Sequence, residues 1–140
     1  MIILDTNVIS EVMRGRLAEP SVLNWLGSLR DRPVTTVINR AEIMAGVALL
    51  PSGGRRDRLW DAAVAAFDQL GTCLPLVPEC ASVYAEIVAS RRAAGRPIGG
   101  MDALIASIAR VAGVGIATRD VDGFADLGFE VINPWEPDGD

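Results

Sequence analysis

Four acidic residues that are far apart in the chain could carry out chemistry together: Asp5, Glu42, Asp102 and Asp120. Asp5 and Asp120 each come just after a short apolar run that is typical of a buried strand. Glu42 and Asp102 each lie in the first turns of an apolar helical segment. An acid near a hydrophobic core is costly unless another group compensates its charge. A shared divalent cation is the simplest group that compensates all four, so their placement indicates a metal site.

Two missing residue types narrow the chemistry further. The chain has no histidine and no lysine, so all 13 of its basic residues are arginine. This composition excludes Ser-His-Asp and Cys-His nucleophiles, histidine metal sites, Schiff-base lysines and the lysine of a phosphate-binding loop. An enzyme built from carboxylates, hydroxyls and arginine needs a bound ion, and oxygen ligands favour Mg²⁺ or Mn²⁺ over zinc or copper.

The overall composition predicts one folded domain. The chain has 140 residues, of which 50% are hydrophobic, and a net charge of −5. We expect a single domain over residues 1–135 and a polar tail over 136–140. We expect no signal peptide and no membrane span, and the two cysteines form no disulfide framework, so the expected location is the cytoplasm. The negative charge opposes a strongly basic nucleic-acid binder but allows a nuclease whose acids bind metal.

Apolar strands alternate with helical segments along the chain. We expect strands at residues 2–4, 33–37, 73–77, 114–118 and 130–132, and helices at 6–13, 20–29, 39–50, 55–70, 79–94 and 101–112. This order predicts an α/β fold: a mostly parallel sheet of about five strands with helices on both faces. Ligands of such folds bind beyond the carboxyl ends of the strands, where Asp5 and Asp120 are expected.

Each of the first two acids also has a plain structural interpretation. Asp5 or Thr6 could simply cap the helix that follows. Glu42 could form a capping pair with Asn39, three residues earlier.

The other two acids have similar alternatives. Asp102 suits the N-terminus of its helix on electrostatic grounds alone. Asp120 could belong to a turn that ends at Gly123, and Asp122 fits a turn better still.

Several motifs, taken in order, resemble the PIN-domain ribonucleases, and among them the toxin subunits of the VapC and FitB type. The resemblance covers residues 1–11, 41–48, 97–106, 117–120 and 131–135, which is nearly the whole chain. It implies that Asp5, Glu42, Asp102 and Asp120 surround one or two Mg²⁺ or Mn²⁺ ions, although many relatives carry Asn at the position of Asp120. The implied reaction is RNA hydrolysis by a metal-activated water.

Four further polar residues are expected to support this site. Thr6 and Asn7 follow Asp5 directly and are expected to orient it. By the resemblance, Thr36 and Thr118 match hydroxyl positions found near the acids in the family.

The resemblance also implies partners. These are an RNA substrate, a cognate antitoxin that is a small DNA-binding protein, and a second copy of the chain in a homodimer. The candidates for contact with RNA are two arginine clusters, Arg55-Arg56-Arg58 and Arg91-Arg92-Arg96, each of which could instead be a solvated helix face.

Other functions remain open at this stage. A phosphatase of the haloacid dehalogenase kind needs a second Asp where this chain has Asn7, and it also needs a lysine. A receiver domain needs the same lysine. Two alternatives are harder to exclude: a solitary RNA-processing nuclease of the PIN type, and a non-catalytic binding module whose acids only cap helices.

Overall fold

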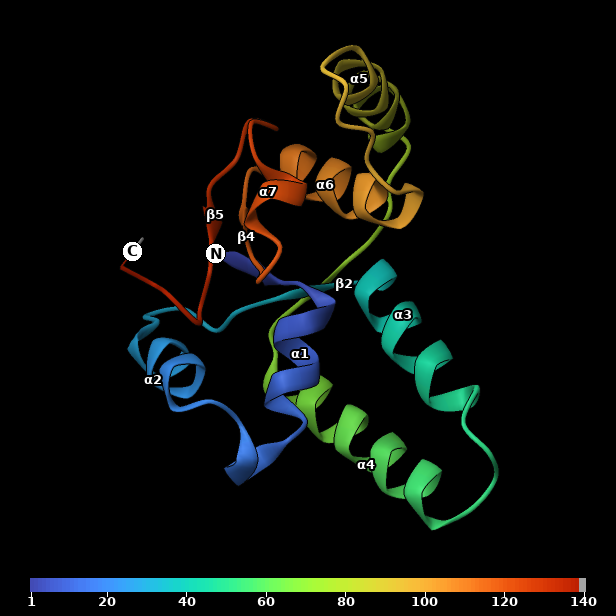
Figure 1. The fold of residues 1–140 in the computed structure, drawn as a ribbon, viewed down its shortest axis with the longest axis vertical. Helices are drawn as coiled ribbons and strands as arrows, with labels where there is room; N and C mark the ends of the chain where they lie inside the picture. Colours follow the sequence, from blue (N-terminus) through green and yellow to red (C-terminus); the bar gives the residue numbers. More distant parts are fainter. Residues whose placement is uncertain (139–140) are drawn as a thin grey trace.

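Strands and helices alternate from the first residues of the chain, as predicted. The computed structural model describes residues 1–138 (Figure 1). Its strands are β1 (Ile2–Leu4), β2 (Thr35–Thr36), β3 (Cys73–Leu74), β4 (Gly115–Ala117) and β5 (Val131–Ile132). Its helices are α1 (Thr6–Val12), α2 (Pro20–Ser28), α3 (Val37–Ala48), α4 (Gly54–Gln69), α5 (Cys80–Ala93), α6 (Gly100–Ala112) and α7 (Val121–Phe124), with a 3₁₀ turn at Gly15–Leu17.

Each expected strand and helix has a counterpart, and the short helix α7 replaces an expected turn. No helix within residues 1–138 is both long enough and apolar enough to cross a membrane. In the predicted polar tail, residues 136–138 are exposed and the last two residues lie outside the described part of the chain.

The expected single sheet of five strands is divided into two parallel sheets. One sheet has the order β1-β4-β5, and the other pairs β2 with β3. Val34, just before β2, still forms a bridge with Ile3 of β1. The backbone N–H of the next residue, Thr35, bonds instead to the carbonyl of Thr72 at 3.3 Å. The chain therefore diverges from β1 after one residue, and this divergence separates the two sheets.

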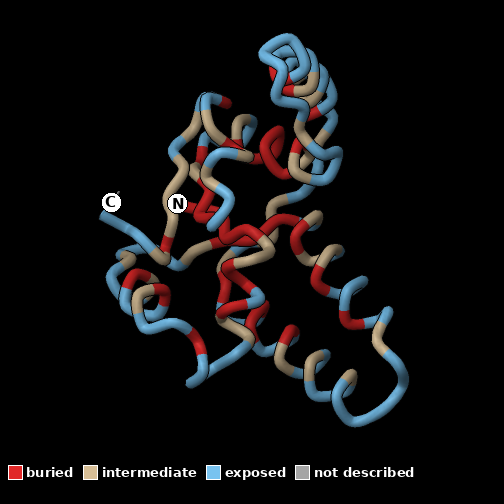
Figure 2. Tube along the Cα trace, in the orientation of Figure 1, coloured by how far each residue is buried: buried red, intermediate tan, exposed pale blue. Residues whose placement is uncertain are grey.

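Side chains on the two faces of the three-stranded sheet enter two different cores. Ile3 and Ile116 belong to the core beneath α5 and α6. Ile2, Leu4 and Ala117 belong to the core shared with α1, α2 and α4. Figure 2 shows buried residues concentrated along the strands between these two groups of helices. The alternation of successive strand residues between faces produces the predicted three-layer arrangement.

Arg91 has a structural role in the α5 layer. Its side chain is only 8% exposed. Its Nε donates to the carbonyl of Arg96 at 2.8 Å, and its Nη1 donates to the carbonyls of Gly123 and Ala125 at 3.1 and 3.4 Å. The predicted role of Arg91 in RNA binding is therefore wrong, because its guanidinium is buried and joins α5 to α7.

Replacing Arg91 should destabilise the fold. Arg91→Ala removes a buried charged donor that bonds three carbonyls, so we expect the free energy of unfolding in urea to fall by about 2–3 kcal/mol. Arg92→Ala is the matched control, because Arg92 is the exposed neighbour on the same helix, and it should change stability by less than about 0.5 kcal/mol. Equal effects of the two substitutions would contradict the role given to Arg91.

Candidate active site

Asp5 lies at the centre of the candidate site, at the carboxyl end of β1. Its backbone N–H donates to the carbonyl of Ala117 at 2.9 Å, so the strand pairing places it beside the end of β4. Its side chain is buried, with 5% exposure. Asp5 is the N-cap residue of α1 by position, but its carboxylate makes no capping hydrogen bond. The alternative that Asp5 only caps a helix is therefore wrong.

Hydrogen bonds from three elements hold the Asp5 carboxylate. Asn39 Nδ2 in α3 donates to Oδ1 at 3.2 Å. Thr118 Oγ1, just after β4, donates to Oδ2 at 2.8 Å, and Asn7 Nδ2 in α1 lies 3.4 Å from the same oxygen. Burial raises the pKa of Asp5, the bonds from Thr118, the Thr6 backbone and Asn39 oppose that rise, and the charge of Asp120 adds to it.

Asn39 is a site residue that sequence reasoning missed. It is fully buried, and its Nδ2 donates both to Asp5 and, at 3.1 Å, to Thr6 Oγ1. Its Oδ1 accepts from Thr36 Oγ1 at 2.6 Å. The predicted N-cap role of Asn39 is wrong, because Thr36 caps α3 by accepting from the Asn39 backbone N–H. Thr36 therefore supports the site indirectly, by fixing the amide that holds Asp5.

Glu42 approaches the site from the middle of α3. Its Oε1 accepts a hydrogen bond from Thr6 Oγ1 at 2.8 Å. A chain of hydrogen bonds thus runs from Asn39 through Thr6 to Glu42. Because α3 begins at Val37 and is capped by Thr36, Glu42 is too far along the helix to act as its capping partner. The capping alternative is excluded for Glu42 as well.

Asp120 combines a structural contact with a place in the site. It is the N-cap of α7, and its Oδ1 accepts from the backbone N–H of Gly123 at 3.1 Å. Its own N–H donates to Thr118 Oγ1 at 3.1 Å, which ties it to the group that holds Asp5. A Cβ at Gly123 would collide with the Asp120 carboxylate, so a larger residue at position 123 would require this carboxylate to move. The predicted turn role belongs to Asp120 and not to Asp122, whose described contact is through its backbone carbonyl.

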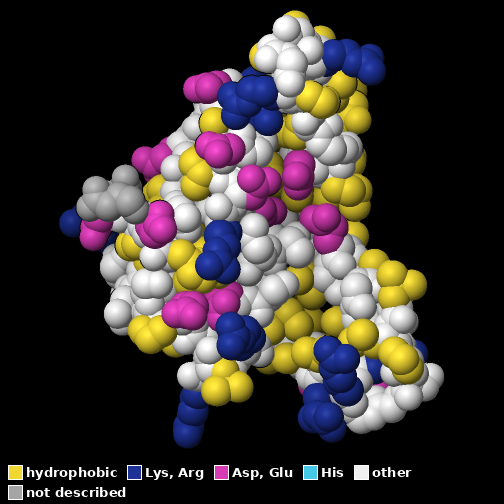
Figure 3. All heavy atoms as spheres, viewed as in Figure 1, with side chains coloured by type: hydrophobic (Ala, Val, Ile, Leu, Met, Phe, Trp, Pro, Cys, Tyr) yellow, Lys and Arg dark blue, Asp and Glu magenta, His cyan; other side chains and the backbone are white. Residues whose placement is uncertain are grey.

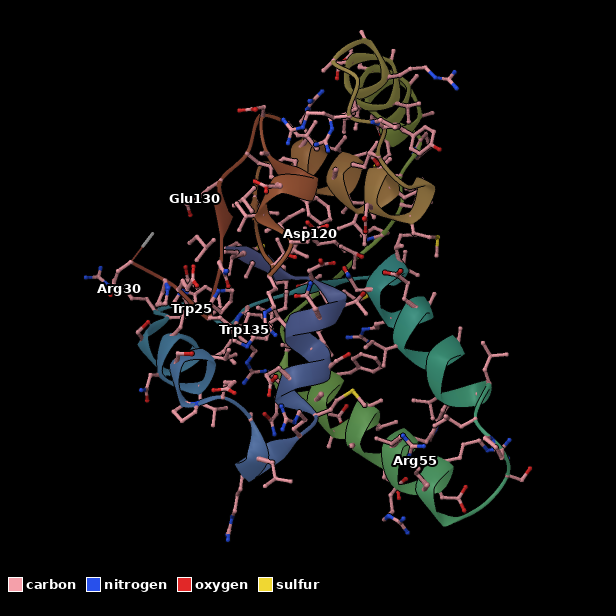
Figure 4. The ribbon with its side chains drawn as sticks, in the orientation of Figure 1. Trp25, Arg30, Arg55, Asp120, Glu130 and Trp135 are labelled. Atoms are coloured by element: carbon pink, nitrogen blue, oxygen red, sulfur yellow. The ribbon has the colours of Figure 1, made fainter. Side chains whose placement is uncertain are left out.

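Asp102 is the acid that responds most to the other three. It lies in the first turn of α6 and is partly buried. The pKa of Asp102 is raised to about 6. The largest cause is burial, and the charges of Asp5, Glu42 and Asp120 add to it. Acids that repel one another in this way must share a small region. Acidic side chains gather at the centre of the face in Figure 3, around the position that Figure 4 labels Asp120.

The four acids converge without forming a closed ligand shell. Within residues 1–138, no three acidic or other ligating side chains are arranged to hold an ion as they stand. Hydrogen bonds hold Asp5, Glu42 and Asp120 in place. All the side-chain atoms of the four acids that could bind a metal are oxygens, which is the ligand chemistry of Mg²⁺ and Mn²⁺. A bound cation would also offset the negative charges that help to raise the pKa of Asp102.

The remaining arginines that were predicted to bind RNA lie on the surface of α4 and at or just after the end of α5. Arg55 and Arg56 are in the first turns of α4, and Figure 4 shows Arg55 at the far end of the α3–α4 pair from Asp120. Arg92 is exposed on α5. An arginine that the sequence did not single out, Arg119, lies directly before Asp120, with its guanidinium 4.8 Å from the Trp135 ring centroid.

Known proteins resemble this chain over almost its full length. The PIN domain family matches residues 2–130. The VapC ribonuclease Y4jK of Sinorhizobium fredii is 38% identical over 144 residues, covering 98% of this chain and 99% of that protein. The toxin FitB of Neisseria gonorrhoeae is 37% identical over 138 residues, covering 96% and 99%. A structure of FitAB bound to an IR36 DNA fragment superposes with a TM-score of 0.81 at 34% identity, covering 96% of each chain.

The raised pKa of Asp102 leads to a prediction about pH and stability. A carboxyl whose pKa in the folded state is about 6 contributes most to stability below about pH 4, and this contribution is lost as the pH rises through about 6. Asp102→Asn cannot ionise. In EDTA at pH 8 it should be more stable than wild type by about 1 kcal/mol, a figure reduced for solvent screening of a partly exposed group.

Urea unfolding at pH 4.5 and pH 8 tests this expectation, since the gain should be much smaller at the lower pH. Asp57→Asn is the matched control, because Asp57 is an exposed acid in the first turn of α4. It should show no such pH dependence. A gain of equal size at both pH values for Asp102→Asn would contradict the electrostatic origin of the shift.

Proposed function

This chain belongs to the PIN-domain family, and we propose that it is a metal-dependent endoribonuclease that acts as the toxin of a toxin–antitoxin pair. The observation that carries the proposal is the convergence of the four acids. Hydrogen bonds through Asn39, Thr6 and Thr118 link Asp5, Glu42 and Asp120. Burial and the charges of these three acids raise the pKa of Asp102. The relative from S. fredii is named a VapC ribonuclease and the one from N. gonorrhoeae is named a toxin, and both names support it.

The proposed cofactor is Mg²⁺, with Mn²⁺ as the alternative, held by Asp5, Glu42, Asp102 and Asp120. When bound, the ion would lower the pKa of a water molecule and offset charge on the RNA phosphate. The residues of the chain prepare the ligands for this task. Asn39 and Thr118 orient the Asp5 carboxylate and Thr6 orients Glu42. Asp102 loses its proton more easily once a cation offsets the neighbouring charges.

Substitutions in the site should lower the rate of RNA cleavage by different amounts. Asp5→Asn and Asp102→Asn should eliminate Mg²⁺-dependent cleavage of single-stranded RNA, as EDTA should for the wild type. Asn39→Ala should lower the rate by about 10- to 100-fold, because it removes a group that orients a ligand. Asp120→Asn should have the smallest effect of the acid substitutions, because an amide oxygen can still cap α7.

Gel assays of a labelled RNA with each purified variant provide the measurement. Asp57→Asn, which changes an exposed acid remote from the site, should cleave like the wild type. Cleavage that survives both Asp5→Asn and Asp102→Asn would come from a contaminant and would refute the nuclease.

The proposed partner is a small DNA-binding antitoxin that blocks the site. A cavity of about 440 Å³ includes one of the acids, Glu42, in its lining. The other lining residues are polar groups such as Thr6 and Arg14 and apolar groups such as Ile43, Val47 and Leu59. Such a groove suits an apolar segment of a partner chain that places an arginine against Glu42. The structure of FitAB on DNA supports a complex of this kind. We also propose a homodimer and a cytoplasmic location.

A groove substitution should separate toxicity from inhibition. A Cβ at Gly46, which lines the cavity, would meet no atom within 4 Å, so a side chain can start there without a clash and extend into the cavity. Gly46→Trp should therefore retain RNA cleavage but escape inhibition by the proposed antitoxin, for which a small protein encoded next to this chain is the candidate. Ala45→Trp, at an exposed neighbouring position outside the lining, is the control and should remain inhibited.

The two proteins can be purified together and assayed on RNA, in parallel with growth after induction of each variant. Wild-type cleavage that is unchanged by the neighbouring protein would refute the antitoxin proposal and favour a solitary RNA-processing nuclease. Equal growth on induction of wild type and Asp5→Ala would count against a toxin.

A further inference from the structure

A second cavity, of about 420 Å³, is lined by Asp120 and shares no lining residue with the apolar groove. Its lining includes Arg119, Asp120 and Asp122 from the segment after β4, and Asn133 and Glu136 from the segment after β5. Asp120 is thus shared between the candidate metal site and this cavity. A group bound here would therefore lie beside one of the proposed metal ligands.

Arg119 forms one wall of this cavity and is held at two points. Its backbone N–H donates to Asn7 Oδ1 at 3.1 Å, so its position depends on the same residue that contacts Asp5. Its guanidinium stacks on Trp135, which packs against the core. Figure 4 shows Trp135 close to the end of β5, on the same face as Asp120. The side chain is exposed, so the guanidinium is a supported planar group at the cavity wall.

The charges that line the cavity are less favourable for an RNA phosphate than for an uncharged nucleobase. Three carboxylates, those of Asp120, Asp122 and Glu136, line it beside the single guanidinium, so a phosphate would be repelled. A nucleobase has no charge and can stack on a guanidinium plane, as RNA bases do in many complexes. The apolar groups of Val121 and Pro137 at the lining suit the ring of a base, and the carboxylates can accept from its exocyclic amino group.

We propose that this cavity is a nucleobase subsite of the proposed nuclease, and that it prefers adenine, cytosine or guanine to uracil. The inference rests on the proposed function for its substrate class. Arg119 is the residue on which the base stacks, Trp135 holds Arg119 in place, and the carboxylates of Asp122 and Glu136 select bases that carry an amino group. The base it holds belongs to a nucleotide next to the scissile bond.

The first test compares cleavage patterns on a single-stranded RNA pool of random sequence. Wild type with Mg²⁺ should disfavour uracil at one position beside the cut. Arg119→Ala should remove that bias and raise the KM by about tenfold, because one stacked base is lost, with little change in kcat. Arg119→Lys keeps the charge but not the plane and should behave like Arg119→Ala. Arg16→Ala removes an exposed arginine elsewhere and should change neither quantity.

A binding measurement on the metal-free protein gives a readout that needs no cleavage. The chain has three tryptophans, so its indole N–H signals can be assigned by NMR with Trp135→Phe. Adding AMP, CMP or GMP in EDTA should shift the Trp135 signal more than adding UMP, and Arg119→Ala should abolish the difference.

The outcomes separate the two proposals. Absence of metal-dependent cleavage by the wild type would refute the proposed nuclease, whatever shifts the nucleotides cause in the Trp135 signal. Cleavage without any base preference, or a preference that Arg119→Ala leaves intact, would overturn the subsite and leave the nuclease standing. A Trp135 signal that responds equally to all four nucleotides would also overturn the preference for amino-bearing bases.

Discussion

The burial of one carboxylate, that of Asp5, is the constraint on which the rest of the site depends. The end of β1 is covered on both faces, so Asp5 is almost without contact with solvent. An ionised acid there is stable only if hydrogen bonds replace lost hydration. Asn39 and Thr118 provide them from α3 and from the segment after β4. Each of these residues is itself fixed by another contact, so the site is held by a network and not by single bonds.

Several of the 13 arginines are used for structure. A guanidinium has several donors in one plane and can stack on rings, which an ammonium group does less well. Arg91 bonds three carbonyls, and two nitrogens of Arg110 bond the carbonyl of Leu127 at 2.9 and 2.7 Å. Arg40 lies over Phe67 and Arg119 over Trp135. These four arginines thus make contacts within the fold that a lysine could not reproduce.

Much of this arrangement could be predicted from the sequence because it follows from local patterns. The apolar runs located the strands, and the position of an acid after such a run placed Asp5 at a strand end. Asn39 was misassigned because the helix starts earlier than expected, and its true N-cap, Thr36, lies in a β-strand. The division of the sheet depends on where Thr35 finds its partner, which is a long-range event. Arg91 looked like a surface residue because nothing local indicates that α7 covers it.

The parallel pairing of β1 with β4 has a consequence for how the protein is made. Asp5 bonds to Thr118, which is 113 residues later in the chain. Contacts between such distant residues form late, since the intervening chain must first be ordered. During translation, the first acid leaves the ribosome long before β4, Thr118 and Asp120 exist to complete its surroundings. A chain that has not yet been synthesised as far as β4 therefore lacks the complete acid cluster, so the site can form only after the segment that carries Thr118 and Asp120 has been made.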